Sequence, residues 1–355
     1  MRCHSDKQSG EEDILPSIRI ISALCAVALL LAAAPAGAAE PTLAAVKKRG
    51  ELVCGSNGHL PGLSEVDSQQ KWTGFEVDFC RAVAAAVLGD ATKVRFMPLT
   101  TTDRFDVLRS GKVDLVVRNS AATLTRTVGT GVRDAVIVYV DGQAVAVPKN
   151  LNITALRDLD GAKICLLKGS IYGPTIEDWF QSRKMTVTPL AFNTQAAVSD
   201  AFFEGKCSAV TQDITALVGT ILASGKAADY VMLPDIVTRN PLAAYVRAGD
   251  DEWYDVVRWT LVTMIDAEER GINQLNVDQL RVSGTPSVRK LLGGEDGNGK
   301  LLGLNPLWVY NIVKQVGNYN DVYERNVGVK SSLKFPRGVN GLWNNGGVQY
   351  GLPYR

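Results

Sequence analysis

Residues 109–119 read RSGKVDLVVRN, and residues 203–213 read FEGKCSAVTQD. In both stretches an amphipathic segment ends at Gly-Lys, and the short apolar run that follows finishes in a polar residue. Aligning the two Gly-Lys pairs aligns Asn119 with Asp213. A helix-turn-strand unit that is written twice indicates two similar lobes. We therefore expect Asn119 and Asp213 to face each other across a shared cleft.

The residues around both copies alternate between strand and helix patterns. Apolar residues at helical spacing form one face of a helix that starts at Phe75, and Gly89 ends it. Alternating strands and helices predict parallel sheet in each lobe. The predicted strands are 51–55, 93–98, 113–117, 162–169, 185–191 and 209–211, and residues 55–64 are predicted as a loop. The predicted helices are 75–88, 103–110, 175–183, 196–204, 217–223, 252–269, 306–316 and 319–326.

Two extended segments follow the two units, at 143–150 and 241–250. They are predicted to pass between the lobes, so that the chain forms lobe one, then lobe two, then returns to lobe one. Two strands would then make a hinge. Residues 282–355, rich in Gly, Asn and aromatic residues, are predicted to pack as a tail on lobe one.

The N-terminal segment has the features of an export signal. Residues 20–39 carry no charge, and Ala36-Gly37-Ala38 is a small-x-small cleavage site, so residues 1–39 are predicted to be a cleaved signal peptide and the mature chain to be periplasmic. The alternative is a retained membrane anchor. The whole chain of 355 residues is 46% apolar with a net charge of +1, which gives no case for a nucleic-acid partner.

Four cysteines remain after residue 39, and an even number in an exported chain favours disulfides. Of the three possible connectivities, the local one gives each lobe its own bridge: Cys54 with Cys80, and Cys165 with Cys207. The alternative is buried free thiols. Zinc is disfavoured because no CxxC pair is present.

The polar residues after the repeated strands suit a small zwitterion. Ligands bind beyond the carboxyl ends of parallel strands, where residues 120–126 (SAATLTR) end in Arg126, whose guanidinium can pair with a carboxylate. Asp213 suits an ammonium group. The alternatives are a surface ion pair for Arg126 and a turn or helix cap for Asp213. The loop 168–173 could offer backbone amides to a carboxylate at a helix N-terminus.

At this point the sequence resembles the periplasmic solute-binding proteins of polar and general L-amino-acid ABC transporters, and is most similar to the general amino-acid subgroup. The similarity covers nearly all of the chain after residue 39. The stretches that carry it are GELVCGSN, WTGFEVDFCRAVAAAVLGDATKV, RFDVLRSGKVDL, VRNSAATLTR, GDDEWYDVVRWTLVTMIDAEERGI, VGNYNDVYERNVG and LWNNGGVQYGLPYR.

The resemblance implies an α/β fold of two lobes, the type II periplasmic-binding-protein fold with a two-strand hinge. It places the first part of lobe 1 at 40–146, lobe 2 at 147–242, and the return to lobe 1 with a C-terminal extension at 243–355. It implies a monomer that closes on an L-amino acid and docks on an inner-membrane ABC permease, with no cofactor or metal. The local cysteine pairing also fits that subgroup.

The family's ligand residues transfer one by one. Arg126 matches the arginine that binds the α-carboxylate, and Thr123 matches the middle threonine of its T-x-T-x-x-R motif. Asp213 matches the acidic residue that binds the α-ammonium. Asn119 matches a backbone-contact position, and Ser170 matches a hydroxyl from lobe two that assists the carboxylate.

The sequence departs from the family at the first threonine of that motif, which is Ala121 here, and at the tryptophan of the general subgroup, which is Ala122. His59 and Leu60 stand where the family has an apolar and more aromatic wall. We expect either a ligand with a larger side chain or weaker amino-acid binding, because a hydrogen bond and an aromatic contact are lost. The alternative functions are an enzyme acting on a small carboxylic acid, and a sensory binding protein.

Overall fold

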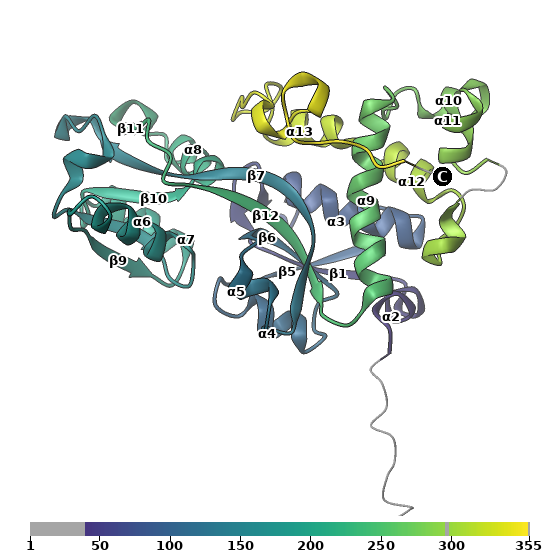
Figure 1. Ribbon diagram of the computed structural model, residues 1–355, viewed down its shortest axis with the longest axis horizontal. Coiled ribbons are helices and arrows are strands. Elements are labelled where there is room, and N and C mark those ends of the chain that lie inside the picture. The colour runs from purple at the N-terminus through teal and green to yellow at the C-terminus, as the bar shows by residue number, and fades with distance from the viewer. Residues whose placement is uncertain (1–39, 295–297, 354–355) are drawn as a thin grey trace, which may run out of the picture. The chain divides into compact units, whose positions relative to one another are not determined.

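The fold is organised around one nine-stranded sheet and one three-stranded sheet. The structure is a computed structural model that describes residues 40–294 and 298–353 (Figure 1). Strands of the large sheet are ordered β5-β1-β6-β12-β7-β10-β8-β9, and β11 pairs with β7. Its strands are β1 (Leu52–Ser56), β5 (Val94–Pro98), β6 (Leu115–Ala121), β7 (Val132–Pro148), β8 (Lys163–Leu167), β9 (Thr188–Phe192), β10 (Ala209–Asp213), β11 (Tyr230–Met232) and β12 (Thr238–Arg247). The small sheet holds β2 (His59–Leu60), β3 (Ser64–Val66) and β4 (Trp72–Thr73).

Two groups of strands are parallel, as the alternating pattern predicts. β1 pairs in parallel with β5 and β6, and β8 pairs in parallel with β9 and β10. We call the part built on β5, β1 and β6 the first lobe and the part built on β10, β8 and β9 the second lobe. β7 and β12 lie between them and pair antiparallel with each other, and Figure 1 shows both strands running from one lobe to the other.

Helices cover both groups of strands. They are α2 (Thr42–Arg49), α3 (Phe75–Leu88), α4 (Arg104–Arg109), α5 (Leu124–Thr127), α6 (Tyr172–Gln181), α7 (Gln195–Phe203), α8 (Ile214–Ala223), α9 (Asp251–Glu269), α10 (Val277–Ser283), α11 (Pro286–Leu291), α12 (Trp308–Gln315) and α13 (Tyr319–Asn326). Local residues set several ends: Gly89 stops α3 in the left-handed conformation at φ 73°. The Asp250 side chain accepts a hydrogen bond from the amide of Trp253 and so caps α9.

Each lobe has its own apolar core. In the first lobe, Phe75 on α3, Trp253 on α9 and Trp308 on α12 belong to one buried cluster. In the second lobe, α6 and β8 contribute to one cluster, and α7, α8 and β10 contribute to another. The α/β fold of two lobes is therefore confirmed. Within residues 40–294 and 298–353, none of the helices combines the length and the apolar character needed to cross a bilayer.

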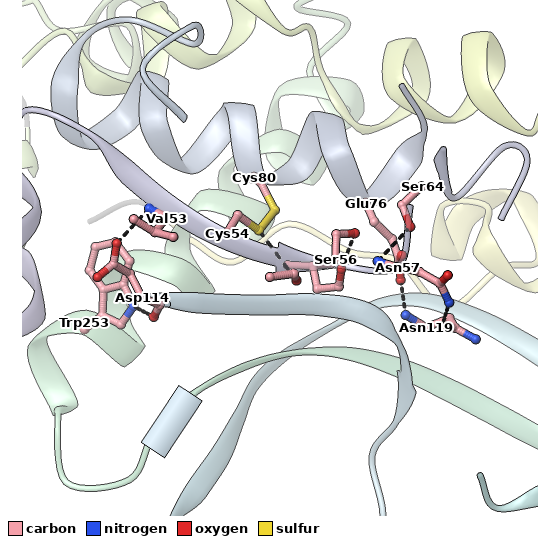
Figure 2. The surroundings of a disulfide bond; sticks show 12 residues. Val53, Cys54, Ser56, Asn57, Ser64, Glu76, Cys80, Asp114, Asn119 and Trp253 are labelled. Carbon is pink, nitrogen blue, oxygen red and sulfur yellow. Dashed lines mark hydrogen bonds between the residues drawn. A yellow bond between two sulfur atoms is a disulfide. The ribbon is translucent and has the colours of Figure 1, made fainter. Parts of the chain in front are cut away.

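The predicted disulfide pairing is confirmed. Cys54 on β1 is bonded to Cys80 on α3, with their Cα atoms 6.3 Å apart, and Figure 2 shows this bond beneath the helix. Cys165 on β8 is bonded to Cys207, which precedes β10, with their Cα atoms 5.8 Å apart. The alternative of free thiols is therefore wrong. Each bridge joins segments of one lobe.

The strand predictions were too short at the lobe crossing. The extended segments predicted at 143–150 and 241–250 overlap β7 and β12, but both strands begin earlier and end two or three residues sooner. The early half of β7 mixes buried, half-buried and exposed residues without a regular alternation, so its sequence pattern did not mark it as a strand, although it pairs with β12. The predicted loop 55–64 contains β2 and the start of β3.

The C-terminal segment packs on the first lobe, as expected. Tyr319 and Tyr323 of α13 are fully buried against Phe75. Asn340 closes a pair of hydrogen bonds with the backbone of Val140 on β7, at 2.8 and 2.9 Å. The extension is thereby fastened to a strand that joins the lobes. The predicted signal peptide, residues 1–39, lies outside the described residues.

Candidate functional site

The ends of the two repeated phrases meet in the fold. The side-chain amide of Asn119 donates a hydrogen bond to Oδ2 of Asp213 at 3.4 Å. Asn119 is near the carboxyl end of β6, Asp213 is at the end of β10, and both side chains line one cavity of about 20 Å³. The prediction that these two residues face each other is confirmed.

Five of the six predicted ligand residues line this cavity, which we call the anchor cavity. They are Asn119, Ala121, Arg126, Ser170 and Asp213. Thr123 is not among the lining residues. It precedes α5, and its hydroxyl lies 3.3 Å from that of Thr125.

Asn119 takes a backbone conformation that turns its side chain into the site. Its φ is 29°, a left-handed value that asparagine tolerates better than most residues. The β6–β12 register shifts here, from Ala121 opposite Leu242 to Val117 opposite Ala244, which marks a bulge. The predicted strand end at residue 117 was therefore wrong, because β6 resumes pairing after the bulge.

The surroundings of Asn119 hold it in place. Its backbone amide donates to the buried carboxylate of Glu76 on α3 (Figure 2). Its side-chain oxygen accepts from Asn57 at 3.3 Å and from Arg118 at 3.5 Å. Burial raises the pKa of Glu76 to about 7, against the opposing effects of the Asn119 amide and the Arg118 charge.

Arg126 reaches the anchor cavity from α5. Its Nη1 donates to the carbonyl oxygen of Ala121 at 2.9 Å, and the hydroxyl of Tyr245 donates to the same oxygen at 2.8 Å. Burial lowers the pKa of Arg126, while the negative charge of Asp213 acts in the opposite direction. The guanidinium is therefore oriented by the backbone and belongs to the cavity rather than to a surface ion pair.

Asp213 is 1% exposed and is held by amide donors. Asn240 donates to its Oδ1 at 2.5 Å. Burial raises its pKa, and hydrogen bonds from Asn240, Tyr172 and Asn119 oppose this effect. Asp213 occupies the N-cap position of α8, as the alternative expected, but its side chain makes no capping hydrogen bond, so its carboxylate is not used by the helix.

The hydroxyl of Ser170 is already hydrogen-bonded within the turn formed by residues 167–172. Its Oγ donates to the Leu167 carbonyl at 2.5 Å and accepts from the Tyr172 amide at 3.3 Å. The turn carries Tyr172 to the start of α6, where it is 5% exposed and lines the anchor cavity.

Sequence reasoning missed several buried polar residues of this site. Arg104, Arg118, Thr101 and Asn240 also line the anchor cavity. Arg118 lies in the quoted phrase, and a charged residue inside an apolar strand was a usable signal. No local pattern marked Asn240, which lies within β12.

A second, larger cavity adjoins the first. It measures about 300 Å³ and shares Arg118 and Leu167 with the anchor cavity. His59 and Gln195 also line it, whereas Leu60 is buried in the core of the first lobe. Of the two residues that stand where the family has an apolar wall, His59 lines this cavity and Leu60 does not.

Asp141 lies on β7, close enough to Asp213 for their charges to interact, and is expected to make stability depend on pH. It accepts hydrogen bonds from the amides of Gly142 at 2.8 Å and Thr215 at 3.3 Å. Burial, and then the charge of Asp213, raise its pKa to about 7 from 3.8. Between pH 3.8 and about 7, Asp141 is protonated in the folded state but ionised in the unfolded state. The free energy of unfolding should therefore fall as the pH rises through this range.

Asp141→Asn should remove this fall in the free energy of unfolding with rising pH. The gap in unfolding free energy between pH 5 and pH 8 should shrink by about 1–3 kcal/mol, as measured by urea unfolding at both values. Asp251→Asn, an exposed carboxylate on α9, is the control and should keep the wild-type gap. An unchanged gap in Asp141→Asn would show that this carboxyl is ionised throughout.

Comparisons with known proteins match this architecture. The family model of the bacterial extracellular solute-binding proteins, family 3, matches residues 52–272. The putative amino-acid ABC transporter-binding protein YhdW of Escherichia coli K12 is 42% identical over 95% of this chain and 99% of its own. The general L-amino acid-binding periplasmic protein AapJ of Rhizobium johnstonii is 39% identical, with the same coverage.

Among solved structures, a periplasmic binding protein of an ABC transporter from Brucella ovis, with glutathione bound, is 42% identical. The match covers 89% of this chain and 100% of that one, with a TM-score of 0.87.

Proposed function

Because the chain belongs to family 3 of the bacterial extracellular solute-binding proteins, we propose that it is the solute-binding component of an amino-acid ABC transporter. It binds an L-amino acid between its lobes and delivers it to an inner-membrane permease. The observation that carries the proposal is that Arg126 of the first lobe and Asp213 of the second line one buried cavity. One cationic and one anionic pole match the two charged ends of a free amino acid.

Each anchor takes one end of the ligand. Arg126 binds the α-carboxylate through the guanidinium nitrogens that do not hold Ala121. Asp213 accepts the α-ammonium, and its amide partners keep its oxygens aimed at the cavity. Asn119, Ser170 and the backbone of Ala121 complete the site. A ligand contact from Thr123 remains a prediction that this cavity does not support, because Thr123 is not among its lining residues.

Ligand entry requires the lobes to separate. A cavity of about 20 Å³ holds little more than water, so an amino acid needs a wider opening. We assign the hinge to β7 and β12, the strands that join the lobes, with boundaries at 40–146, 147–242 and 243–355. Ligand contacts made by both lobes favour the closed state, and the permease reads that state. The protein acts as a monomer in the periplasm after removal of residues 1–39.

Replacing Asp213 by asparagine tests the proposal. The substitution keeps an acceptor oxygen but removes the charge that faces the ammonium, so affinity should fall about 30-fold, or about 2 kcal/mol. Calorimetric titration of the purified protein with the twenty L-amino acids identifies the ligand first. Asp200→Asn, an exposed carboxylate on α7, is the matched control. Silence from all twenty amino acids, or undiminished affinity in Asp213→Asn, would contradict the proposal.

The space beside the anchor cavity favours a ligand longer than a small amino acid. Ala121 and Ala122 are small, and the adjoining cavity of about 300 Å³, which shares Arg118 with the anchor cavity, leaves room for the rest of a longer ligand. The Brucella ovis relative was solved with glutathione, which is a γ-glutamyl tripeptide. We therefore include a γ-glutamyl peptide as a second candidate ligand, and glutathione belongs in the same titration.

The enzyme and sensory alternatives make different predictions. We propose binding without chemical conversion, in keeping with the family. Mass spectrometry of the ligand after incubation with the protein would reveal an enzyme by a changed mass. A permease gene next to this one would favour transport over a sensory role.

A further inference from the structure

Arg104 is a buried cation for which the described part of the chain supplies no salt-bridge partner. It starts α4, is 3% exposed and lines the anchor cavity. Its Nε and Nη1 atoms are buried and have no hydrogen-bond partner among residues 40–294 and 298–353. The guanidinium stacks on Phe105, with its central carbon 4.5 Å from the ring centre, which orients the group but leaves those donors unused.

Each of the other two arginines of the cavity lies near a carboxyl group whose negative charge favours its charged form. Arg118 interacts with Glu76, and Arg126 interacts with Asp213. The charged groups that act most strongly on Arg104 are instead two further guanidiniums, those of Arg126 and Arg118. Burial and this repulsion lower the pKa of Arg104 to about 9, so the group still carries its charge at neutral pH.

An uncompensated charge of this kind is costly unless an anion joins it. Thr101 adds a second unused donor, because its Oγ1 is buried, lacks a hydrogen-bond partner among the described residues and belongs to the same cavity lining. A guanidinium and a hydroxyl together suit a carboxylate, which accepts from both.

A simple amino acid cannot supply that anion. Its α-carboxylate is taken by Arg126 and its ammonium by Asp213. We propose that the ligand carries a second carboxylate on its side chain, and that Arg104 with Thr101 binds it. This inference rests on the proposed function. Acidic amino acids and γ-glutamyl peptides share this chemistry, since each has an α-amino-acid end and a further carboxylate.

The competing explanation is that Arg104 shares the α-carboxylate with Arg126. The two readings differ in which ligands need Arg104. If it binds a side-chain carboxylate, only ligands with that group lose affinity when it is replaced. If it shares the α-carboxylate, every amino acid loses affinity equally.

The first experiment compares matched ligands on the wild-type protein by calorimetry. L-Glutamate and L-glutamine have nearly the same shape but differ in one charge, so glutamate should bind at least about tenfold more tightly. Glutathione and its glycine amide make the same comparison for a peptide. Whichever of glutamate and glutathione binds more tightly shows whether the second carboxylate belongs to an acidic amino acid or to a γ-glutamyl peptide. Equal affinity within both pairs would overturn the inference. Failure of every compound to bind would overturn the proposed function instead.

The second experiment replaces Arg104. In Arg104→Gln the preferred acid should lose about 30-fold or more in affinity, while its neutral amide changes less than about threefold. Arg104→Lys, which keeps the charge, should restore part of the preference. Arg109→Gln is the control, because Arg109 lies on the same helix with a side chain that is 43% exposed.

Equal losses for the acid and its amide in Arg104→Gln would assign Arg104 to the α-carboxylate and overturn the inference. Circular dichroism and thermal unfolding establish that the variant is folded. If Arg104→Gln does not fold, the wild-type comparison of acid and amide decides the matter alone.

Discussion

Replacing Arg126 by alanine is expected to weaken ligand binding severely. The substitution removes the bidentate donor for the α-carboxylate and leaves that carboxylate buried without a cation when the lobes close. Truncating one partner of a buried charge pair costs about 2–5 kcal/mol, which corresponds to a loss of about 30-fold to several thousand-fold in affinity. Calorimetry with the preferred ligand measures this loss directly.

The fold should survive this change. Arg126 is a lining residue on a four-residue helix, and no core cluster contains it. The carbonyl of Ala121 that loses the Arg126 donor keeps its hydrogen bond from Tyr245. Thermal unfolding of the ligand-free variant should therefore stay close to wild type. Arg133→Ala, which removes an exposed arginine paired with Asp251, is the matched control and should bind normally. Wild-type affinity in Arg126→Ala would refute the assigned role.

Removing the second-lobe disulfide is expected to cost about 4 kcal/mol of stability. Cys165 and Cys207 are separated by 42 residues, and a cross-link over a loop of that length restricts the unfolded chain by about that amount in the chain-entropy model. Both cysteines are buried, at 0% and 4% exposure, so alanine fits the space without introducing an unpaired polar group. Urea unfolding of Cys165→Ala/Cys207→Ala measures the effect.

The first-lobe bridge provides the comparison. Cys54→Ala/Cys80→Ala opens a loop of 26 residues and should cost slightly less, about 3.5 kcal/mol in the same model. Reductant should lower the urea midpoint of the wild type, and should lower that of each double variant only by the effect of its remaining bridge. A midpoint that does not move when Cys165 and Cys207 are replaced would mean that the bridge does not restrict the unfolded chain.

Much of the fold could be predicted because its signals are local. The apolar face of α3 depends on residues three and four apart, and its stop depends on Gly89 alone. The duplicated Gly-Lys phrase located β6 and β10 and aligned Asn119 with Asp213. The rule that ligands gather at strand ends then placed both in one site. The even number of cysteines after residue 39, two in each predicted lobe, favoured the local pairing that the structure contains.

The rest could not be predicted because it depends on residues far apart in the chain. β7 pairs with β12 over residues 132–143, and neither strand has a pattern that reveals its partner. Arg104 looks like an ordinary charged residue at a helix start. Its burial, and the absence of an acidic partner among the described residues, follow from the approach of Arg118 and Arg126 to the same cavity.

The amino-acid sequence by itself indicated the main order of strands and helices, the two lobes, a local cysteine pairing, and Arg126 and Asp213 as candidate anchors. These depend on periodicity and spacing, which neighbouring residues impose on each other through backbone geometry and side-chain burial. Only the tertiary structure decided the bulge that aims Asn119, the amide donors that hold Asp213, and the isolation of Arg104. These features depend on contacts between segments that are far apart in the chain. The free-energy cost of burying a charge is set by the charged and polar groups that those segments place beside it.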